Sequence, residues 1–162
     1  MTAQPFGHAE AEAKIPASAQ RIFDRLDDPH ALASHMTQRS WMMVGTSMSI
    51  ETDDQLGKAV GSVIRMRGKV VGIPISLDEI VTQYDPPFHK TWVTQGEPKL
   101  LVIGAYRMGF KLMTDGEMST LRVWIDYDLP SQTLWRWLGL LFGRFYAHWC
   151  VRRMAEDANT FF

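Results

Sequence analysis

The side chains best suited to chemistry in this sequence are one carboxylate and one phenol. Glu79 alternates in phase with apolar residues of a predicted strand, namely Val71, Ile73, Ile75, Leu77 and Val81. A carboxylate among apolar groups is expected to have a raised pKa, which suits a general acid or base. A bulge at Pro74 would instead reverse the strand face and turn Glu79 to water, so both orientations stay open.

Tyr106 is the hydroxyl that the pattern places best. It lies in phase with Val102, Met108, Phe110 and Leu112 on another predicted strand, so its hydroxyl is expected to reach the interior. There it could be bound by the backbone as an ordinary core tyrosine, or it could face a cavity. Glu79 with Tyr106 is the one acid/base pair that the sequence suggests.

Other groups do not form a recognisable catalytic or metal site. Asp126 and Asp128 alternate with apolar residues and are expected to face water, which leaves a paired-carboxylate site unsupported. His148 and Cys150 lie about 200° apart on a helix, so they cannot act together as base and nucleophile. The five histidines are scattered singly without metal-ligand spacing. We expect no metal and no cofactor, and we assign no catalytic residue.

The chain as a whole fits one domain, residues 1–162, of 18.5 kDa. The net charge of −1 gives no basic footprint for nucleic acid. A single cysteine cannot form an internal disulfide, and the N-terminal stretch lacks the features of a secretory signal, so a cytoplasmic protein is expected. The 10 methionines and 6 tryptophans favour an adaptable apolar cavity.

The most apolar stretch, LWRWLGLLFGRFYAHWC from Leu134 to Cys150, is not a membrane span. Arg144 lies near its middle, where an arginine costs roughly 2.5 to 3.5 kcal/mol on insertion scales. Gly139 and Gly143 have a spacing that suits helix dimerisation in lipid, or close packing against another backbone. The stretch is better interpreted as part of a long amphipathic helix.

Hydrophobic periodicity predicts one strand, two short helices, about six further strands and one long helix. The first strand is His8–Ile15, the first helix is capped by Ser18, and the second begins at Pro29 and reaches Met36. The six strands are predicted at Trp41–Thr52, Lys58–Arg67, Lys69–Tyr84, His89–Gln95, Leu100–Thr114 and Ser119–Leu129. Turns are predicted at Gly68, at 96–98 and at Asp115-Gly116. The last helix runs from about Thr133 to about Asn159.

This order resembles the helix-grip fold of the SRPBCC superfamily, the START-like and birch-pollen-allergen-like proteins. The stretches that carry the resemblance are IPASAQRIFDRLDD after the first strand, LGKAVGSVIRMRGKVVG in mid-sheet, YDPPFHKTW and the aromatic C-terminal helix. The resemblance implies an α+β fold in which a curved antiparallel sheet of about seven strands wraps round the C-terminal helix. Two short helices follow the first strand, and an apolar cavity lies between sheet and helix.

The C-terminal helix is expected to turn its bulky apolar face to that cavity. This face comprises Phe142, Phe145, Tyr146, Trp149 and Cys150, and the opposite face comprises Arg144, His148, Arg152 and Asn159. The first turns, Leu134–Leu141, are apolar nearly all round, so part of that surface is either covered by loops or exposed. An exposed end could touch a membrane surface transiently.

The resemblance to lipid carriers, quinone-binding proteins and polyketide cyclases implies a cavity ligand. We therefore expect a carrier or sensor that binds a hydrophobic small molecule, such as a lipid, a quinone or a polyketide-like ring. The expected ligand-binding residues are Glu79, Trp92, Tyr106, Phe110, Phe142, Tyr146 and Trp149. One alternative is a polyketide cyclase/dehydratase-type enzyme that uses the same cavity, and a second is an interaction module for a membrane complex. No nucleic acid and no obligate protein partner are expected.

Overall fold

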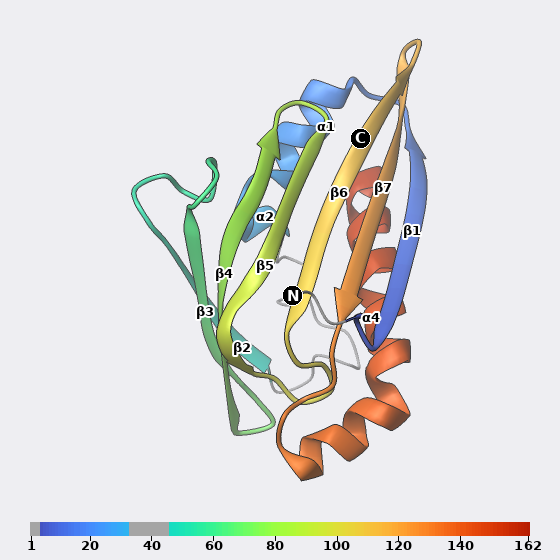
Figure 1. Cartoon of the computed structure of the whole chain (residues 1–162). Coiled ribbons are helices and arrows are strands. Elements are labelled where there is room, and N and C mark those ends of the chain that lie inside the picture. The colour runs from blue at the N-terminus through green and yellow to red at the C-terminus, as the bar shows by residue number, and fades with distance from the viewer. Residues whose placement is uncertain (1–3, 33–45) are drawn as a thin grey trace.

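An antiparallel sheet of seven strands curves around one long helix in the computed structural model of this chain (Figure 1). The structure describes residues 4–32 and 46–162. The strands are β1 (Gly7–Ile15), β2 (Thr46–Thr52), β3 (Val63–Val70), β4 (Ile73–Asp85), β5 (His89–Lys99), β6 (Tyr106–Asp115) and β7 (Met118–Tyr127). The helices are α1 (Ala19–Leu26), α2 (Pro29–Leu32) and α4 (Thr133–Phe161). This arrangement confirms the predicted helix-grip fold.

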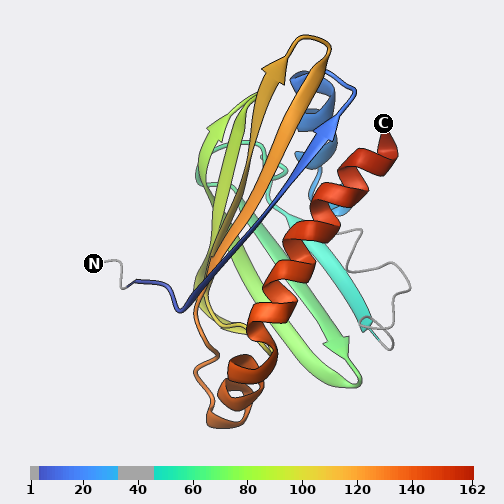
Figure 2. The same cartoon turned by 90° about the vertical axis from the view of Figure 1, so that its right-hand side faces the viewer.

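The strand order in the sheet is β1-β7-β6-β5-β4-β3-β2. Strands β2 to β7 follow one another as a meander, and β1 joins the far edge beside β7. Helix α4 packs chiefly on β1 and β7, while α1 packs on β6 and on α4. Figure 2 shows α4 crossing the concave side of the sheet, with the two short helices beyond its C-terminal half.

The start of the chain folds as its local pattern predicts. β1 buries Ala9 and Ile15 on one side, although alanine, glutamate and lysine favour helix, because strict alternation gives a strand one apolar face. The side chain of Ser18 then caps α1 by accepting a hydrogen bond from the backbone N–H of Arg21 at 3.4 Å. The predicted extension of the second helix to Met36, and the predicted strand start at Trp41, lie outside the described residues.

The turn predicted at Gly68 is wrong. The chain reverses at Val71-Gly72, where φ is 50° and 78°. Two successive residues in the left-handed region form the tight turn whose twist matches a hairpin. Gly68 lies inside β3 instead, where a Cβ would collide with the backbone carbonyl of Ser47 on β2. A close approach between strands therefore requires this glycine, which is the other common reason for glycine within a sheet.

The predicted strand Lys58–Arg67 begins later than expected, at Val63, because a carboxylate folds the preceding segment. Asp53 accepts hydrogen bonds from the Ser62 hydroxyl at 2.5 Å and from the backbone N–H groups of Val63 and Gln55 at 2.8 and 3.1 Å. These hydrogen bonds lower the pKa of Asp53, the one from Ser62 most. Residues 53–62 form turns, and only then does β3 start.

The predicted turn at 96–98 is also wrong, since β5 runs through it to Lys99. β5 pairs with β6 only from His89 to Val93, and beyond that point its paired neighbour is β4. Pro98, which lacks an N–H, is therefore tolerated within the strand. β6 begins at Tyr106, so the first six residues of the predicted strand Leu100–Thr114 form a loop.

The C-terminal helix has nearly the predicted length, but its buried side is made of small residues. The buried residues of α4 are Gly139, Gly143, Ala147, Cys150, Val151, Met154, Ala155 and Ala158. A Cβ on Gly139 would lie 2.8 Å from Pro130, and one on Gly143 would lie 2.9 Å from the carbonyl oxygen of Val102. The glycine spacing thus serves close packing against the chain. No helix in the described ranges is long and apolar enough to cross a membrane.

Candidate functional site

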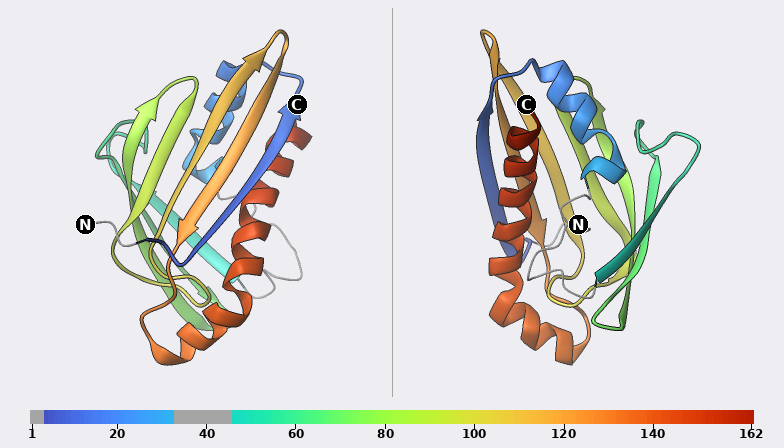
Figure 3. Two further views of the ribbon diagram at one scale, coloured as in Figure 1. Left: turned by 45° about the vertical axis from the view of Figure 1, so that its right-hand side comes forward. Right: turned by 180° about the vertical axis from the view of Figure 1, so that it is seen from behind.

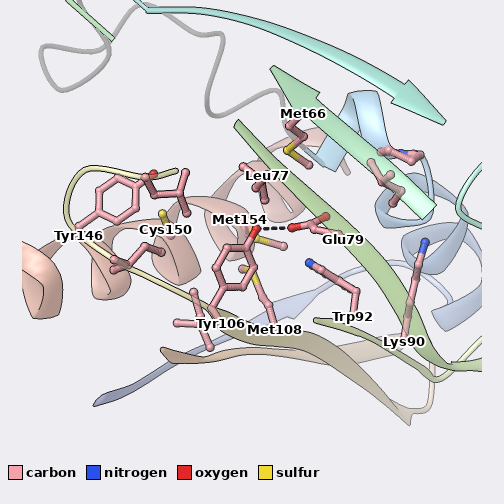
Figure 4. Close-up of a pocket in the computed structure, with 15 residues that line it drawn as sticks. Met66, Leu77, Glu79, Lys90, Trp92, Tyr106, Met108, Tyr146, Cys150 and Met154 are labelled. Carbon is pink, nitrogen blue, oxygen red and sulfur yellow. Dashed lines mark hydrogen bonds between the residues drawn. The ribbon is translucent and has the colours of Figure 1, made fainter. Parts of the chain in front are cut away.

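An apolar cavity lies between the concave face of the sheet and α4 (Figure 4). Its volume is about 70 Å³, room for several water molecules or for the slim end of an organic ligand. Among the described residues, 15 line it, and three of them are the methionines Met66, Met108 and Met154. Methionine side chains are flexible and polarisable, so the walls can adapt to a larger occupant.

Glu79 points into this cavity. It lies in β4 between Ile64 of β3 and Thr94 of β5, and only 4% of it is exposed. The pairing of β4 with β3 continues without a register shift past Pro74, so the face that contains Leu77 and Glu79 stays inward. Of the two orientations that the sequence leaves open, the structure has the inward one. The predicted companions at the turn end are wrong, because Val71 and Ile73 are exposed there.

The carboxylate of Glu79 accepts a hydrogen bond from the hydroxyl of Tyr106. Figure 4 shows this contact as a dashed line, with the indole nitrogen of Trp92 turned to the same carboxylate. Burial raises the pKa of Glu79 to about 7, against the opposing effects of the Tyr106 and Trp92 hydrogen bonds and the charge of Lys90. Glu79 therefore exchanges a proton near neutral pH, whereas an exposed glutamate is fully ionised there.

Tyr106 is fixed at the first residue of β6. Its backbone N–H donates to the Thr94 hydroxyl at 3.1 Å. The residue as a whole is partly exposed, but its hydroxyl is buried. This burial is the main cause that raises the phenol pKa well above its ordinary value, and the negative charge of the nearby Glu79 carboxylate is the second. The hydroxyl is thus a donor at neutral pH, and its partner is a side chain and not the backbone.

A second buried polar group, which the sequence interpretation missed, lies beside Glu79. Lys90 Nζ lies 2.7 Å from Asp27 Oδ1, and the exposed fractions of these side chains are 2% and 6%. The Tyr84 hydroxyl donates to the other oxygen of Asp27 at 2.8 Å. Burial lowers the pKa of Lys90, and Asp27 opposes that shift. One signal was available: Lys90 alternates in phase with Trp92, the residue that was expected to face inward.

Helix α4 supplies Tyr146 and Cys150 to the cavity wall. Burial raises the pKa of the Cys150 thiol to about 12, against an opposing hydrogen bond with Tyr146. A thiol with such a pKa is a weak nucleophile at neutral pH, so Cys150 is a small apolar wall residue there. Tyr146 stacks on Trp149 with ring centroids 5.9 Å apart, and this contact orients its ring.

The structure gathers only some of the predicted ligand-binding residues. Those that line the cavity are Glu79, Trp92, Tyr106 and Tyr146. Phe110 lies in the solid core, with its ring centroid 5.5 Å from that of Phe23, and Trp149 lies beside Tyr146 and not on the wall. Placing Phe142 at the cavity is wrong, because 51% of it is exposed. Its neighbour Gly143 faces the chain, and successive helical residues point about 100° apart.

No cluster of three or more His, Cys, Asp or Glu side chains that could hold a metal occurs in the described parts of the chain. Among the described residues, the polar groups at the cavity are one carboxyl, two phenols, one indole, one thiol and one ammonium that is paired to Asp27. Such a set can hold a polar group of a ligand by hydrogen bonds and can exchange a proton through Glu79.

No protein-family model and no curated protein sequence matches this chain. Solved structures do match its fold. Norcoclaurine synthase from Thalictrum flavum is 16% identical with a TM-score of 0.64, over 96% of this chain and 85% of that one. A protein from Thermus thermophilus is 14% identical with a TM-score of 0.62, over 94% and 97% of the two chains. Ara h 8.0201 is 11% identical with a TM-score of 0.58, over 95% and 98%.

These identities are low, so what the likeness establishes is the fold. The chain has the helix-grip fold of the birch-pollen-allergen-like proteins, in agreement with the resemblance that its sequence carries.

Proposed function

We propose that this helix-grip protein binds a hydrophobic small molecule in the cavity between its sheet and α4, as a carrier or sensor. The observation that carries the proposal is the composition of the cavity wall, which is mostly apolar and contains the hydrogen-bonded pair Glu79 and Tyr106. Ligand sites of this kind gain affinity from apolar burial and orientation from a few polar groups. The cytoplasmic location and the single-domain organisation stay predictions.

The shape and chemistry of the wall favour a mostly apolar ligand with one polar end, such as a lipid, a quinone or a polyketide-like ring. The polar end would lie at Glu79, where a ligand hydroxyl or carbonyl can replace or join the Tyr106 hydrogen bond. A ligand larger than the present 70 Å³ requires the wall to move, and Met66, Met108 and Met154 are the side chains that can do so at low cost.

Catalysis in the same cavity is the second candidate, and one observation favours it. Burial brings the pKa of Glu79 to about 7, which is the range that a general acid or base needs at neutral pH. The neighbour from Thalictrum flavum is named as a synthase of norcoclaurine, so in that protein the fold supports catalysis on a small molecule. An enzyme of the polyketide cyclase/dehydratase type would use Glu79 to transfer a proton to or from the substrate. Tyr106 would hold the Glu79 carboxyl in position through its hydrogen bond.

The deciding experiment measures binding and turnover on the same variants. Native mass spectrometry and solvent extraction of the purified protein identify a bound apolar compound, which then serves as the titrant. With Glu79→Gln we expect a modest change in affinity, since one hydrogen bond contributes about 0.5 to 1.5 kcal/mol net. Glu10→Gln, which alters an exposed carboxylate of β1, is the matched control.

Two outcomes would change the assignment. If aromatic polyketide-like substrates are turned over and Glu79→Gln lowers the rate by about 10²- to 10⁴-fold while binding persists, the protein is an enzyme. If the folded protein neither retains nor binds any apolar compound, the binding function itself is wrong.

A further inference from the structure

The first half of α4 exposes a continuous apolar surface that the cavity does not explain. Its large exposed side chains are Leu134, Trp137, Leu140, Leu141, Phe142 and Phe145, each between 51% and 67% exposed. We call this set the α4 patch. Figure 2 and Figure 3 show these first turns at one end of the molecule, bent away from the remainder of the helix. Contiguous apolar surface of this kind marks a site of contact with a partner or a membrane.

The spacing of the patch shows that it is one face of the helix. Leu134, Trp137, Leu141 and Phe145 follow one another at intervals of three and four residues, so they form a stripe. The opposite side is the packed one, where Gly139 and Gly143 contact Pro130 and the carbonyl of Val102. In this part of the helix, small residues therefore face the protein and large apolar residues face solvent.

The charged residues within the chain segment that holds the patch are of one sign. From Leu129 to Ala155 the chain has no aspartate or glutamate, whereas Arg136 and Arg144 lie within the patch region and Arg152 follows it, all three exposed. An apolar face with aromatic side chains and flanking arginines is the composition of helices that lie in a membrane interface. Each arginine near an anionic lipid surface adds attraction, and the patch has no acidic group to oppose it.

A second copy of the chain is a poorer fit to the same surface. A two-fold interface would place the patch against itself and so bring Arg136 and Arg144 near their own copies. The patch offers no carboxylate to pair with them. An anionic lipid surface satisfies the arginines and accepts the apolar side chains at once.

We infer that the α4 patch docks on an anionic lipid bilayer, with its stripe of Leu134, Trp137, Leu141 and Phe145 at the acyl boundary. The patch ends one residue before Tyr146, which lines the cavity, so docking brings the cavity wall next to the bilayer. The bilayer is then the source or the recipient of the hydrophobic ligand. This loading role rests on the proposed function, whereas the docking itself does not.

The test is cosedimentation of the full chain with vesicles of phosphatidylcholine alone or with phosphatidylglycerol added. We expect binding to the anionic vesicles, weaker binding to the neutral ones, and a loss of binding at high salt because exposed charges are screened. Leu141→Glu should weaken binding by on the order of tenfold or more, since it replaces a leucine that the bilayer would bury with an acid. Arg144→Gln should weaken it about fivefold, which corresponds to about 1 kcal/mol.

Matched controls alter equally exposed residues elsewhere. Val71→Glu changes an apolar side chain that is 75% exposed at the β3–β4 turn, and Arg65→Gln changes an exposed arginine of β3. Neither should change vesicle binding. The altered side chains are exposed, so thermal unfolding should show that all four variants fold as the wild type does. A blue shift of tryptophan emission on anionic vesicles, lost in Trp137→Phe, would place the patch at the bilayer.

Absence of binding to anionic vesicles would overturn the inference, and so would equal losses in Leu141→Glu and Val71→Glu. Light scattering measures the oligomeric state and so tests self-association. If the wild type is a dimer that Leu141→Glu converts to a monomer, with vesicle binding unchanged, the patch serves self-association. A fluorescent fatty acid titrated without vesicles reports on the cavity alone. If neither this probe nor any extracted apolar compound binds the cavity while the vesicle results hold, the proposed function is wrong and the docking stands.

Discussion

The hydroxyl of Tyr106 on β6 donates a hydrogen bond to the carboxylate of Glu79 on β4, across the intervening strand β5. The two residues are 27 positions apart in the chain. The contact forms because both side chains point to the concave side of the sheet. The curvature of the sheet brings side chains on that side closer together, even when their strands are not adjacent. It makes a hydrogen-bonded polar site in a mostly apolar cavity.

The buried carboxyl of Glu79 should make stability depend on pH. Its pKa is about 7 in the folded chain against 4.5 as the ordinary value, so the folded state binds more protons than the unfolded state between these values. Stability should therefore fall as the pH rises from about 4.5 to about 7 and stay level above that. Glu79→Gln should remove this dependence and stabilise the protein by about 3 kcal/mol above pH 7.

Urea unfolding at a series of pH values measures this effect. The control is Glu10→Gln, whose exposed carboxylate should leave the pH profile of the wild type unchanged. A Glu79→Gln profile with the same slope as the wild type would show that Glu79 is ionised and solvated in the folded chain.

Tyr106→Phe should raise the pKa of Glu79 above 7. The Tyr106 hydrogen bond stabilises the carboxylate, so its removal leaves burial less opposed. Carbon-13 NMR titration of labelled glutamate carboxyls reports the midpoint directly. Tyr146→Phe is the control, because the Tyr146 hydroxyl interacts with Cys150 and should leave the midpoint in place. A midpoint that stays or falls in Tyr106→Phe would contradict the assigned donor.

Lys90→Met should destabilise the fold by about 3 to 5 kcal/mol. The substitution leaves the Asp27 carboxylate buried with Tyr84 as its remaining side-chain partner, and an uncompensated buried charge is costly. Chemical denaturation gives the free energy of unfolding. The double variant with Asp27→Asn should lose less than the sum of the single losses, because the stranded charge is then removed.

An exposed ion pair supplies the comparison for Lys90. Arg122 pairs with Glu12 at 2.6 Å, but these side chains are 46% and 48% exposed. Arg122→Met should destabilise the fold far less than Lys90→Met, because water screens an exposed ion pair. Similar losses in Lys90→Met and Arg122→Met would mean that the Asp27 pair is accessible to water.

Gly143→Ala should destabilise the protein, although alanine favours helix over glycine by about 1 kcal/mol. The added Cβ would lie 2.9 Å from the carbonyl oxygen of Val102, a backbone atom that cannot turn away. We expect a net loss of about 1 to 3 kcal/mol in thermal or chemical unfolding. His148→Ala, at an exposed position of the same helix, should change stability by no more than about 0.5 kcal/mol. Stabilisation by Gly143→Ala would show that α4 can move away from the Val102 carbonyl.

Local signals in the sequence predict much of this fold. The alternation in β1, the Ser18 cap of α1, the Asp115-Gly116 hairpin and the extent of α4 are all as predicted. Each depends on neighbours within one turn or one strand. The two wrong turns are also instructive, because a glycine can serve either a left-handed turn or a close approach. Gly68 is in the second class, and only the position of β2 reveals it.

The candidate site could be predicted in part. Alternation placed Glu79 and Tyr106 in phase with apolar residues of their strands but left open whether the face with Glu79 points inward. No local pattern pairs residues across a third strand. Asp27 and Lys90 were missed because their attraction depends on α1 packing back against the sheet, which brings Asp27 at its C-terminal end to Lys90 of β5. Charged residues that are far apart in sequence reveal a buried pair only when tertiary structure excludes water from both.

The sequence by itself determined which residues of α4 share a face, since a helical period is a local property. Only the tertiary structure decided which face is inside. Hydrophobicity favours burial of Phe142 and Phe145, yet the small residues Gly139, Gly143 and Ala147 face the chain. The backbone carbonyl of Val102 and the ring of Pro130 come so close that a larger side chain has no room there. The packing distance thus set the rotation of the helix and left its aromatic side chains to solvent.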